Sequence, residues 1–205
     1  MIAVLDYGIG NLRSAQKALE RVSGLDVQLV TTAADAAGAN GVVLPGVGAF
    51  GRCMEALRAS GLDIVAKDAI REGVPFLGIC VGMQMLYDGS DEDPDVSGLG
   101  ILPGRIRLLA DGVKRPQMQW NQLHFRGPDD LLFAGVGDGD WVYFVHSYAA
   151  PVDDRVIATV EYGGDVAAAV STGSLWATQF HPEKSGAVGL RILANFAAIA
   201  ASGRS

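Results

Sequence analysis

The first half of the chain alternates short apolar runs with segments whose apolar residues recur at helical spacing. Apolar runs predict strands at residues 2–7, 27–30, 42–44 and 74–79. Helices are expected from residue 12, with Asn11 at the N-cap position, over a short Ala-rich stretch after residue 30, and over one or two segments within residues 51–73. This alternation predicts a mostly parallel sheet with helices on both sides.

The second half changes to a series of strand-like segments that are separated by turn residues. These segments lie at residues 106–109, 117–125, 141–148, 155–162, 166–170 and 175–180. We expect them to extend the sheet in mixed or antiparallel fashion, and we expect a closing helix over residues 186–201. No repeat, low-complexity tract or linker divides the sequence, so residues 1–205 are expected to form one α/β domain.

Composition favours a globular protein that handles small molecules. The 205 residues are 49% apolar and 19% charged, which is ample for a buried core, and 16 Lys and Arg against 23 Asp and Glu give a net charge of −7. The acidic balance makes nucleic acid an unfavourable partner. No apolar run is long enough for a membrane span and no leader pattern is present, so we expect a cytoplasmic protein.

Of the two cysteines, Cys80 has the stronger claim to reactivity. An apolar strand runs into Gly78-Ile-Cys80-Val-Gly82 and then into a helical pattern, which is the thiol form of a nucleophile elbow. The flanking glycines would allow a strained turn that exposes the sulfur at a helix N-terminus, where the thiolate is favoured. The alternative is a small buried core residue, which is also our interpretation of Cys53. Two cysteines are too few for a disulfide framework or a cysteine-built zinc site, and we expect neither metal nor cofactor.

A cysteine nucleophile needs a general base, and His181 is the best candidate of three histidines. In His181-Pro-Glu183 the carboxylate would stand beside the imidazole if the chain is extended, because residues two apart then point to the same side. Glu183 could hold one ring nitrogen protonated and leave the other free to accept the thiol proton. The alternative is a surface ion pair. His124 and His146 lack such a neighbour and are expected to be structural or substrate-facing.

Two glycine-rich turns follow predicted strands. Pro45-Gly-Val-Gly48 could turn backbone N–H groups toward one point, as an oxyanion hole requires, although an ordinary loop has the same composition. Gly8-Ile-Gly10 suggests a dinucleotide fingerprint but fails it, because Arg13 stands where the third glycine is needed.

Taken together, these motifs resemble the class I (triad) glutamine amidotransferases, and within them the glutaminase subunits of imidazole glycerol phosphate synthases. The matching segments follow one another over nearly the whole chain: Asp6-Tyr-Gly-Ile-Gly-Asn-Leu12, Leu44-Pro-Gly-Val-Gly-Ala-Phe50, Gly78-Ile-Cys-Val-Gly-Met-Gln84, Met118-Gln-Trp-Asn121, Tyr143-Phe-Val-His-Ser-Tyr148 and Gln179-Phe-His-Pro-Glu-Lys-Ser185. The elbow and His-Pro-Glu occur throughout the superfamily, whereas the first, fourth and last segments favour this subfamily.

The resemblance implies a flavodoxin-like three-layer sandwich that hydrolyses glutamine through a thioester. Cys80 would be the nucleophile, His181 the proton relay and Glu183 the residue that orients it. Backbone N–H groups of Val81 and of the loop at Val47 and Gly48 would hold the oxyanion, and that loop would need to flip inward if it is not preformed. The positions that match glutamine-binding residues are Gly48, Gln84, Glu92, His146, Ser147 and Tyr148.

The resemblance also implies a partner, a (β/α)₈ cyclase subunit that would receive the ammonia in a heterodimer and use it in histidine biosynthesis. Asn11, Met118, Trp120 and Lys184 match positions that face this partner. Gln117 and Gln119 stand where relatives often have His and Gly, and Ile9 stands where some have Pro. We expect these three departures to lie in the subunit contact, with a bulkier interface loop as the result.

Three other interpretations compete with this one. The chain could serve another synthase, such as one for pyridoxal phosphate or anthranilate, although the flanking motifs argue against that. It could be a stand-alone cysteine hydrolase of the related flavodoxin-like group, which generally lacks a His-Pro-Glu near the C-terminus. A catalytically silent regulatory module is the third alternative, and the complete set of Cys80, His181 and Glu183 argues against it.

Overall fold

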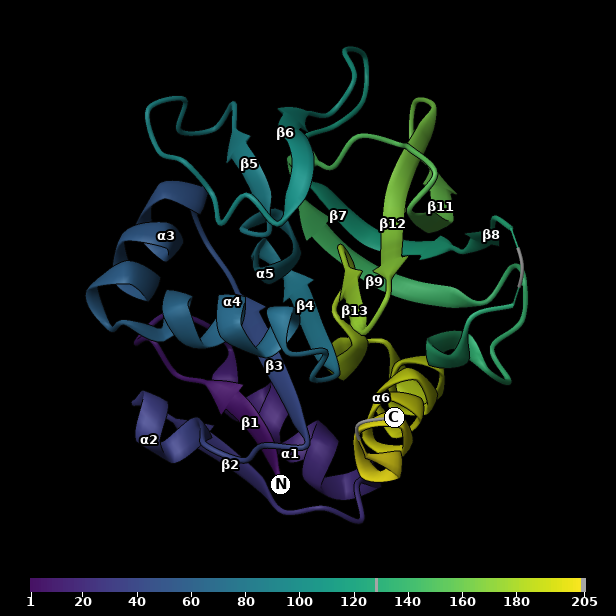
Figure 1. Cartoon of the computed structure of the whole chain (residues 1–205). Coiled ribbons are helices and arrows are strands. Elements are labelled where there is room, and N and C mark those ends of the chain that lie inside the picture. The colour runs from purple at the N-terminus through teal and green to yellow at the C-terminus, as the bar shows by residue number, and fades with distance from the viewer. Residues whose placement is uncertain (128, 204–205) are drawn as a thin grey trace.

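The computed structural model describes residues 1–127 and 129–203 and is built around an eight-stranded sheet (Figure 1). The strand order is β2–β1–β3–β4–β13–β12–β11–β8. The first five strands are mutually parallel: β2 (Val27–Val30), β1 (Ile2–Leu5), β3 (Gly41–Gly46), β4 (Phe76–Cys80) and β13 (Leu175–Thr178). β12 (Asp165–Thr172), β11 (Val156–Glu161) and β8 (His124–Phe125) continue the sheet in antiparallel fashion.

Helices cover both faces of the parallel region, as the alternating pattern predicts. α3 (Phe50–Ala59) and α4 (Leu62–Arg71) lie over one face, where the short α2 (Ala33–Ala36) contacts α4 (Figure 1). α1 (Leu12–Val22) and the closing α6 (Gly186–Ser202) pack together over the other. α6 comes so close to β3 that a Cβ on Gly41 would lie 2.9 Å from that of Ala200. The predicted α/β fold with a mostly parallel sheet and an antiparallel extension is therefore confirmed.

Some second-half strands form two smaller sheets instead of extending the large one. Among the described residues, β7 (Gln117–Gln122) pairs only with β9 (Trp141–His146), in antiparallel fashion. β6 (Leu102–Leu108) lies between β10 (Tyr148–Ala149) and β5 (Tyr87–Ser90). The prediction that every second-half strand joins the main sheet was wrong, because strand pairing depends on partners distant in sequence. β5 was not predicted at all, because it follows the four-residue helix α5 (Val81–Gln84) almost directly.

Candidate active site

Cys80 occupies a strained turn between β4 and α5. Its φ of 56° and ψ of −112° make it the one non-glycine residue with positive φ in the described part of the chain. The neighbouring backbones are packed so closely that a Cβ on Gly82 would lie 1.8 Å from the carbonyl oxygen of Leu44, and one on Gly46 would lie 2.7 Å from the amide nitrogen of Gly82. The elbow geometry therefore depends on glycine at these positions.

His181 and Glu183 form a buried pair. His181 Nδ1 lies 2.8 Å from Glu183 Oε1, and both side chains are almost fully buried. The predicted reason for this pairing was wrong: β13 ends at Thr178, and Pro182–Lys184 forms a 3₁₀ turn. Because proline favours the first position of a helical turn, Pro182 directs the chain into this turn and brings Glu183 back to the ring.

The Cys80 thiol and the Glu183 carboxylate control the charge of His181. Burial acts to lower the pKa of His181, but the Cys80 sulfur and then Glu183 outweigh it and raise the pKa to about 9. Nε2 of His181 makes no hydrogen bond to any residue that the structure describes, so it remains able to exchange a proton with the neighbouring thiol. The raised pKa makes His181 well suited to accept a proton and to hold it within the buried site.

A cavity of about 450 Å³ opens above these residues and brings most of the predicted site together. Its lining includes Cys80, His181, Val47, Gly48, Val81, Gln84, Glu92, His146, Ser147, Tyr148, Asn11 and Lys184. Pro116 and Val145 also line it and were not predicted. Met118 and Trp120 lie outside the cavity and are 62% and 45% exposed on β7. Lys184 extends over the ring of Tyr143, with Nζ 6.0 Å from the centroid.

Two candidate glutamine-binding residues are held by the protein itself. Gln84 donates from Nε2 to the carbonyl oxygen of Tyr148 and to Gln179 Oε1, at 3.0 Å in each case. Glu92 accepts a hydrogen bond from the amide of Phe50 at 2.8 Å, which ties it to the start of α3. These contacts fix both side chains at the cavity wall.

The candidate oxyanion loop leads from β3 into α3. Gly48 has a φ of 91°, and the carbonyl oxygen of Val47 accepts a hydrogen bond from the Cys53 thiol at 3.3 Å. Cys53 is fully buried, in agreement with its interpretation as a packing residue. Burial also raises its pKa, which favours the unreactive thiol form.

Two buried glutamines lie near the site but were not predicted to belong to it. Gln179 Nε2 lies 3.8 Å from Cys80 Sγ, and Gln117 Oε1 lies 2.9 Å from His146 Nε2. The prediction that Gln117 faces a subunit partner was wrong: it is fully buried, whereas Gln119 on the same strand is exposed. A polar residue inside an apolar run, as in 175–180, was the available signal for Gln179.

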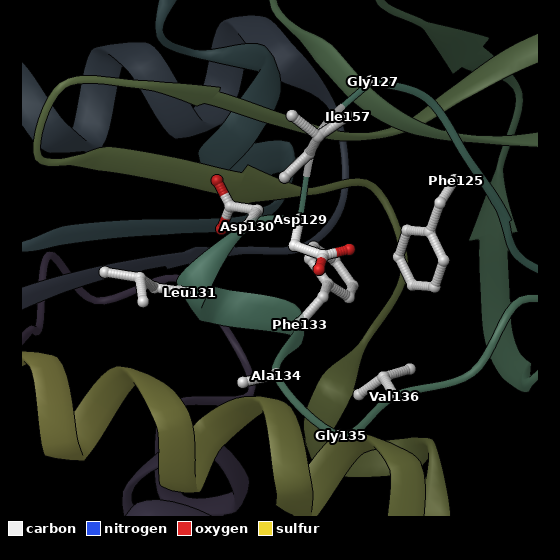
Figure 2. A pocket seen from close by; sticks show the side chains of 10 residues that line it. All are labelled: Phe125, Gly127, Asp129, Asp130, Leu131, Phe133, Ala134, Gly135, Val136 and Ile157. Carbon is white, nitrogen blue, oxygen red and sulfur yellow. The ribbon is translucent and has the colours of Figure 1, made fainter.

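A second cavity, of about 430 Å³, lies between β8, β11 and the 3₁₀ turn Leu131–Phe133 (Figure 2). Phe125 and Phe133 meet edge to face in it, and Asp130 accepts hydrogen bonds from Leu132 N and Trp176 Nε1. None of the predicted site residues lines this cavity. His124, nearby on β8, is exposed and lies 3.9 Å from Asp138.

Within residues 1–127 and 129–203, no group of three or more His, Cys, Asp or Glu side chains could hold a metal ion. In the same residues, no helix has the length and apolar character needed to cross a bilayer.

Comparison with known proteins identifies the class. The family described as "Glutamine amidotransferase class-I" matches residues 3–200, so the chain belongs to this family. Solved structures with the same fold include one described as "Crystal structure of glutamine amidotransferase" (22% identity, TM-score 0.76, 98% of each chain). Another is "Structure of PurLQS from Thermotoga maritima" (20% identity, TM-score 0.72, 95% of this chain and 96% of the other).

Within this class, two curated relatives share about half of their residues with this chain. The chain is 52% identical to "Imidazole glycerol phosphate synthase subunit HisH" of Synechococcus sp. (strain JA-3-3Ab), over 95% of this chain and 92% of the relative. It is 51% identical to the protein of the same name from Deinococcus radiodurans, again over 95% and 92%.

Proposed function

We propose that this chain is the glutaminase subunit of an imidazole glycerol phosphate synthase and acts as one amidotransferase domain in the cytoplasm. It hydrolyses glutamine to glutamate and ammonia, and the ammonia serves a synthase partner in histidine biosynthesis. Among the features of the site, one observation carries the proposal: Cys80 and the His181–Glu183 pair meet at one cavity in a chain about half identical to HisH subunits.

The chemistry follows from the three side chains. Cys80 passes its thiol proton to Nε2 of His181 as the sulfur attacks the side-chain amide carbon of glutamine, and the carbonyl π electrons move to oxygen. His181 then protonates the leaving nitrogen, so the C–N bond breaks and ammonia and a thioester result. Water attacks the thioester while His181 accepts its proton, and the C–S bond breaks to give glutamate and the free thiol. Glu183 keeps Nδ1 protonated throughout, so that Nε2 faces the reaction.

The remaining cavity residues bind the substrate and the oxyanion. The backbone N–H of Val81, at the start of α5, and those of Val47 and Gly48 hold the oxygen that becomes negative. Gly48, Gln84, Glu92, His146, Ser147 and Tyr148 line the space that glutamine occupies. The side-chain anchoring of Gln84 and Glu92 supports these roles, because a fixed wall loses less entropy on binding.

The partner is a (β/α)₈ cyclase subunit that binds over the mouth of the cavity. There ammonia reacts with a phosphoribulosyl formimino carboxamide ribonucleotide to give imidazole glycerol phosphate and aminoimidazole carboxamide ribonucleotide. Asn11 and Lys184 lie at the cavity, and Met118 and Trp120 are exposed on β7, which supports this face as the contact.

Trp120 tests the contact surface. Trp120→Ala should weaken binding of the cyclase subunit about 10-fold or more, because a large exposed aromatic is a typical interface anchor. Leu131→Ala, at an exposed apolar residue beside the second cavity, is the matched control. Equal dissociation constants for the wild type and Trp120→Ala by calorimetry would place the contact elsewhere.

The experiment for the whole proposal is glutamate release measured under three conditions: this chain alone, with the cyclase subunit, and with that subunit and its nucleotide substrate. Weak activity that rises by orders of magnitude in the last condition supports the proposal. High activity that is indifferent to the partner supports the stand-alone hydrolase instead.

A further inference from the structure

A buried chain of hydrogen bonds joins β7 to the sulfur of Cys80. Gln117 contacts His146 Nε2 at 2.9 Å, and His146 Nδ1 lies 2.8 Å from the carbonyl oxygen of Tyr148. The same oxygen accepts from Gln84 Nε2, which also donates to Gln179 Oε1, and Gln179 Nε2 lies 3.8 Å from Cys80 Sγ. The five side chains in this series of hydrogen bonds are all more than nine-tenths buried: Gln117, His146, Gln84, Gln179 and Cys80.

The Tyr148 carbonyl fixes the direction of the bonds on the Cys80 side. A carbonyl oxygen can only accept, so Gln84 must present its amide nitrogen to it. Both hydrogens of that nitrogen are then used, one on Tyr148 and one on Gln179 Oε1. Because its oxygen is engaged by Gln84, Gln179 directs its amide nitrogen at the Cys80 sulfur.

The same carbonyl fixes the tautomer of His146. Nδ1 faces an acceptor and must therefore carry a proton. If the ring is neutral, Nε2 has no proton and requires a donor. The amide oxygen of Gln117, which lies next to Nε2, can only accept a hydrogen bond, so it would satisfy an imidazolium but not a neutral ring. A half-turn of the Gln117 amide presents its nitrogen to Nε2 instead. Without this half-turn, that nitrogen has no hydrogen-bond partner among the described residues.

The surroundings of His146 decide in favour of the neutral ring. Burial, together with the charge of nearby His181, lowers the pKa of His146 to about 4. The other titratable groups that line the same cavity are Cys80, Glu92, Tyr148 and Lys184, and Glu183 lies behind His181. The Tyr148 carbonyl acts to raise the pKa of His146, but less strongly than burial lowers it. No carboxylate among the described residues hydrogen-bonds to either ring nitrogen, so no opposite charge in direct contact compensates a buried imidazolium.

We propose that Gln117 is a positioning residue whose amide nitrogen donates a hydrogen bond to Nε2 of a neutral His146. This bond completes a chain that holds the carbonyl of Tyr148 in place and ends with an N–H of Gln179 directed at the nucleophile. The consequence for activity rests on the proposed glutaminase function, whereas the hydrogen-bond arrangement does not. An N–H donor stabilises a thiolate, and a neutral His146 leaves His181 as the imidazole that titrates at the cavity.

Histidine is an alternative donor at position 117. A neutral histidine there would likewise donate one N–H to His146. Glutamine and histidine are thus alternative donors for the same acceptor, and neither is required as an outward-facing contact residue.

The first test uses nuclear magnetic resonance of the intact wild-type chain. With only three histidines, ring nitrogen shifts of ¹⁵N-histidine-labelled protein can be assigned with His124→Gln and His146→Gln variants. The proposal predicts that His146 keeps the neutral Nδ1–H tautomer from about pH 5.5 to 8.5. An imidazolium or an Nε2–H tautomer in this range overturns it, whatever the activity of the protein.

The second test changes the donor. Gln117→Glu introduces an acceptor of the same size, so the pKa of His146 should rise by at least about one unit and kcat for glutamate release in the complex should fall about 10-fold. Gln117→His should restore kcat to within about threefold of the wild-type value, and the pKa of His146 to within about 0.5 unit. Gln119→Glu adds the same charge at an exposed site on the same strand and is the matched control for the pKa of His146.

These outcomes separate the two proposals. A Gln117→Glu variant with the same His146 pKa as Gln119→Glu, and with the wild-type kcat at saturating cyclase subunit, overturns the positioning role. If no variant and no wild-type complex hydrolyses glutamine, the proposed function fails, and the His146 tautomer and pKa still decide the inference.

Discussion

The parallel and antiparallel halves of this molecule contribute to the site in different ways. The parallel half supplies Cys80 through a turn whose geometry is specified by adjacent residues, because Gly78, Gly82 and the end of β4 lie in one short segment. The later half supplies His146 and Gln117 through the pairing of β7 with β9, where the contact between these two residues joins positions 29 apart in the sequence. His181 and Glu183 follow β13, the strand that joins the two regions.

The difference shows which parts of a site a sequence can specify locally. A strained elbow requires particular small residues, so its motif is visible without any fold. A buried polar network requires partners from distant strands, and its glutamines look like ordinary polar residues in the sequence. The two halves should therefore respond differently to substitution.

The elbow should be the most sensitive point. Gly82→Ala would place a Cβ 1.8 Å from the Leu44 oxygen, and the backbone cannot yield without opening β3 from β4. We expect a loss of about 3 kcal/mol or more in the free energy of unfolding, by urea denaturation, and no detectable glutamate release. Gly24→Ala, with open space around it, is the control and should change stability by less than about 0.5 kcal/mol. A stable, active Gly82→Ala would remove the steric account of the elbow.

The later half should be most sensitive to acid. Because the pKa of His146 is lowered to about 4, the unfolded chain binds a proton near pH 6.5 that the folded chain does not. The free energy of unfolding should therefore fall as the pH drops from 6.5 to 4, by about 3 kcal/mol from this residue. His181, with its raised pKa, acts in the opposite sense and loses its stabilising contribution as the pH rises from 6.5 to about 9.

Two histidine variants isolate the contribution of His146 to the pH dependence of the free energy of unfolding. Urea denaturation from pH 4 to 7 should show that His146→Gln removes the His146 part of the slope and that His124→Gln, at an exposed site, does not. The same slope in His146→Gln as in the wild type would contradict a neutral buried His146.

The His181–Glu183 pair belongs to neither half, because it follows β13, the strand that joins them. Glu183→Gln keeps the size of the side chain and removes the charge that orients and stabilises His181, while the nucleophile and the base remain. We expect kcat for glutamate release to fall about 10- to 100-fold, with a smaller change in KM. Glu20→Gln on α1 is an exposed control; wild-type kcat in Glu183→Gln would remove Glu183 from the triad.

The sequence predicted the fold best where elements follow one another directly. Residues 27–30 form the predicted strand, and residues 186–202 form the predicted closing helix, extended by one residue. The segment 117–125 divides instead into β7 and β8, which belong to different sheets, because tertiary pairing decides where a polar-rich strand lies.

The candidate site follows the same rule. The meeting of Cys80 with the His-Pro-Glu segment was predictable from motifs, although Glu183 reaches His181 through a 3₁₀ turn and not through strand alternation. The burial of Gln117 was not predictable, since its neighbours Met118 and Trp120 are exposed on the same short strand. Nothing in the local pattern distinguishes Gln117 from the exposed Gln119.

The most direct test of the central claim is to exchange each of the two cysteines for serine and to measure two reactions in the assembled complex. Cys80→Ser should lose glutamine-dependent synthesis by at least about 10³-fold and keep ammonia-dependent synthesis, because added ammonia bypasses the thiol. Cys53→Ser, at a buried thiol that donates to a backbone carbonyl, should retain both reactions. Glutamate release by Cys80→Ser at the wild-type rate would contradict the assignment of Cys80 as the nucleophile.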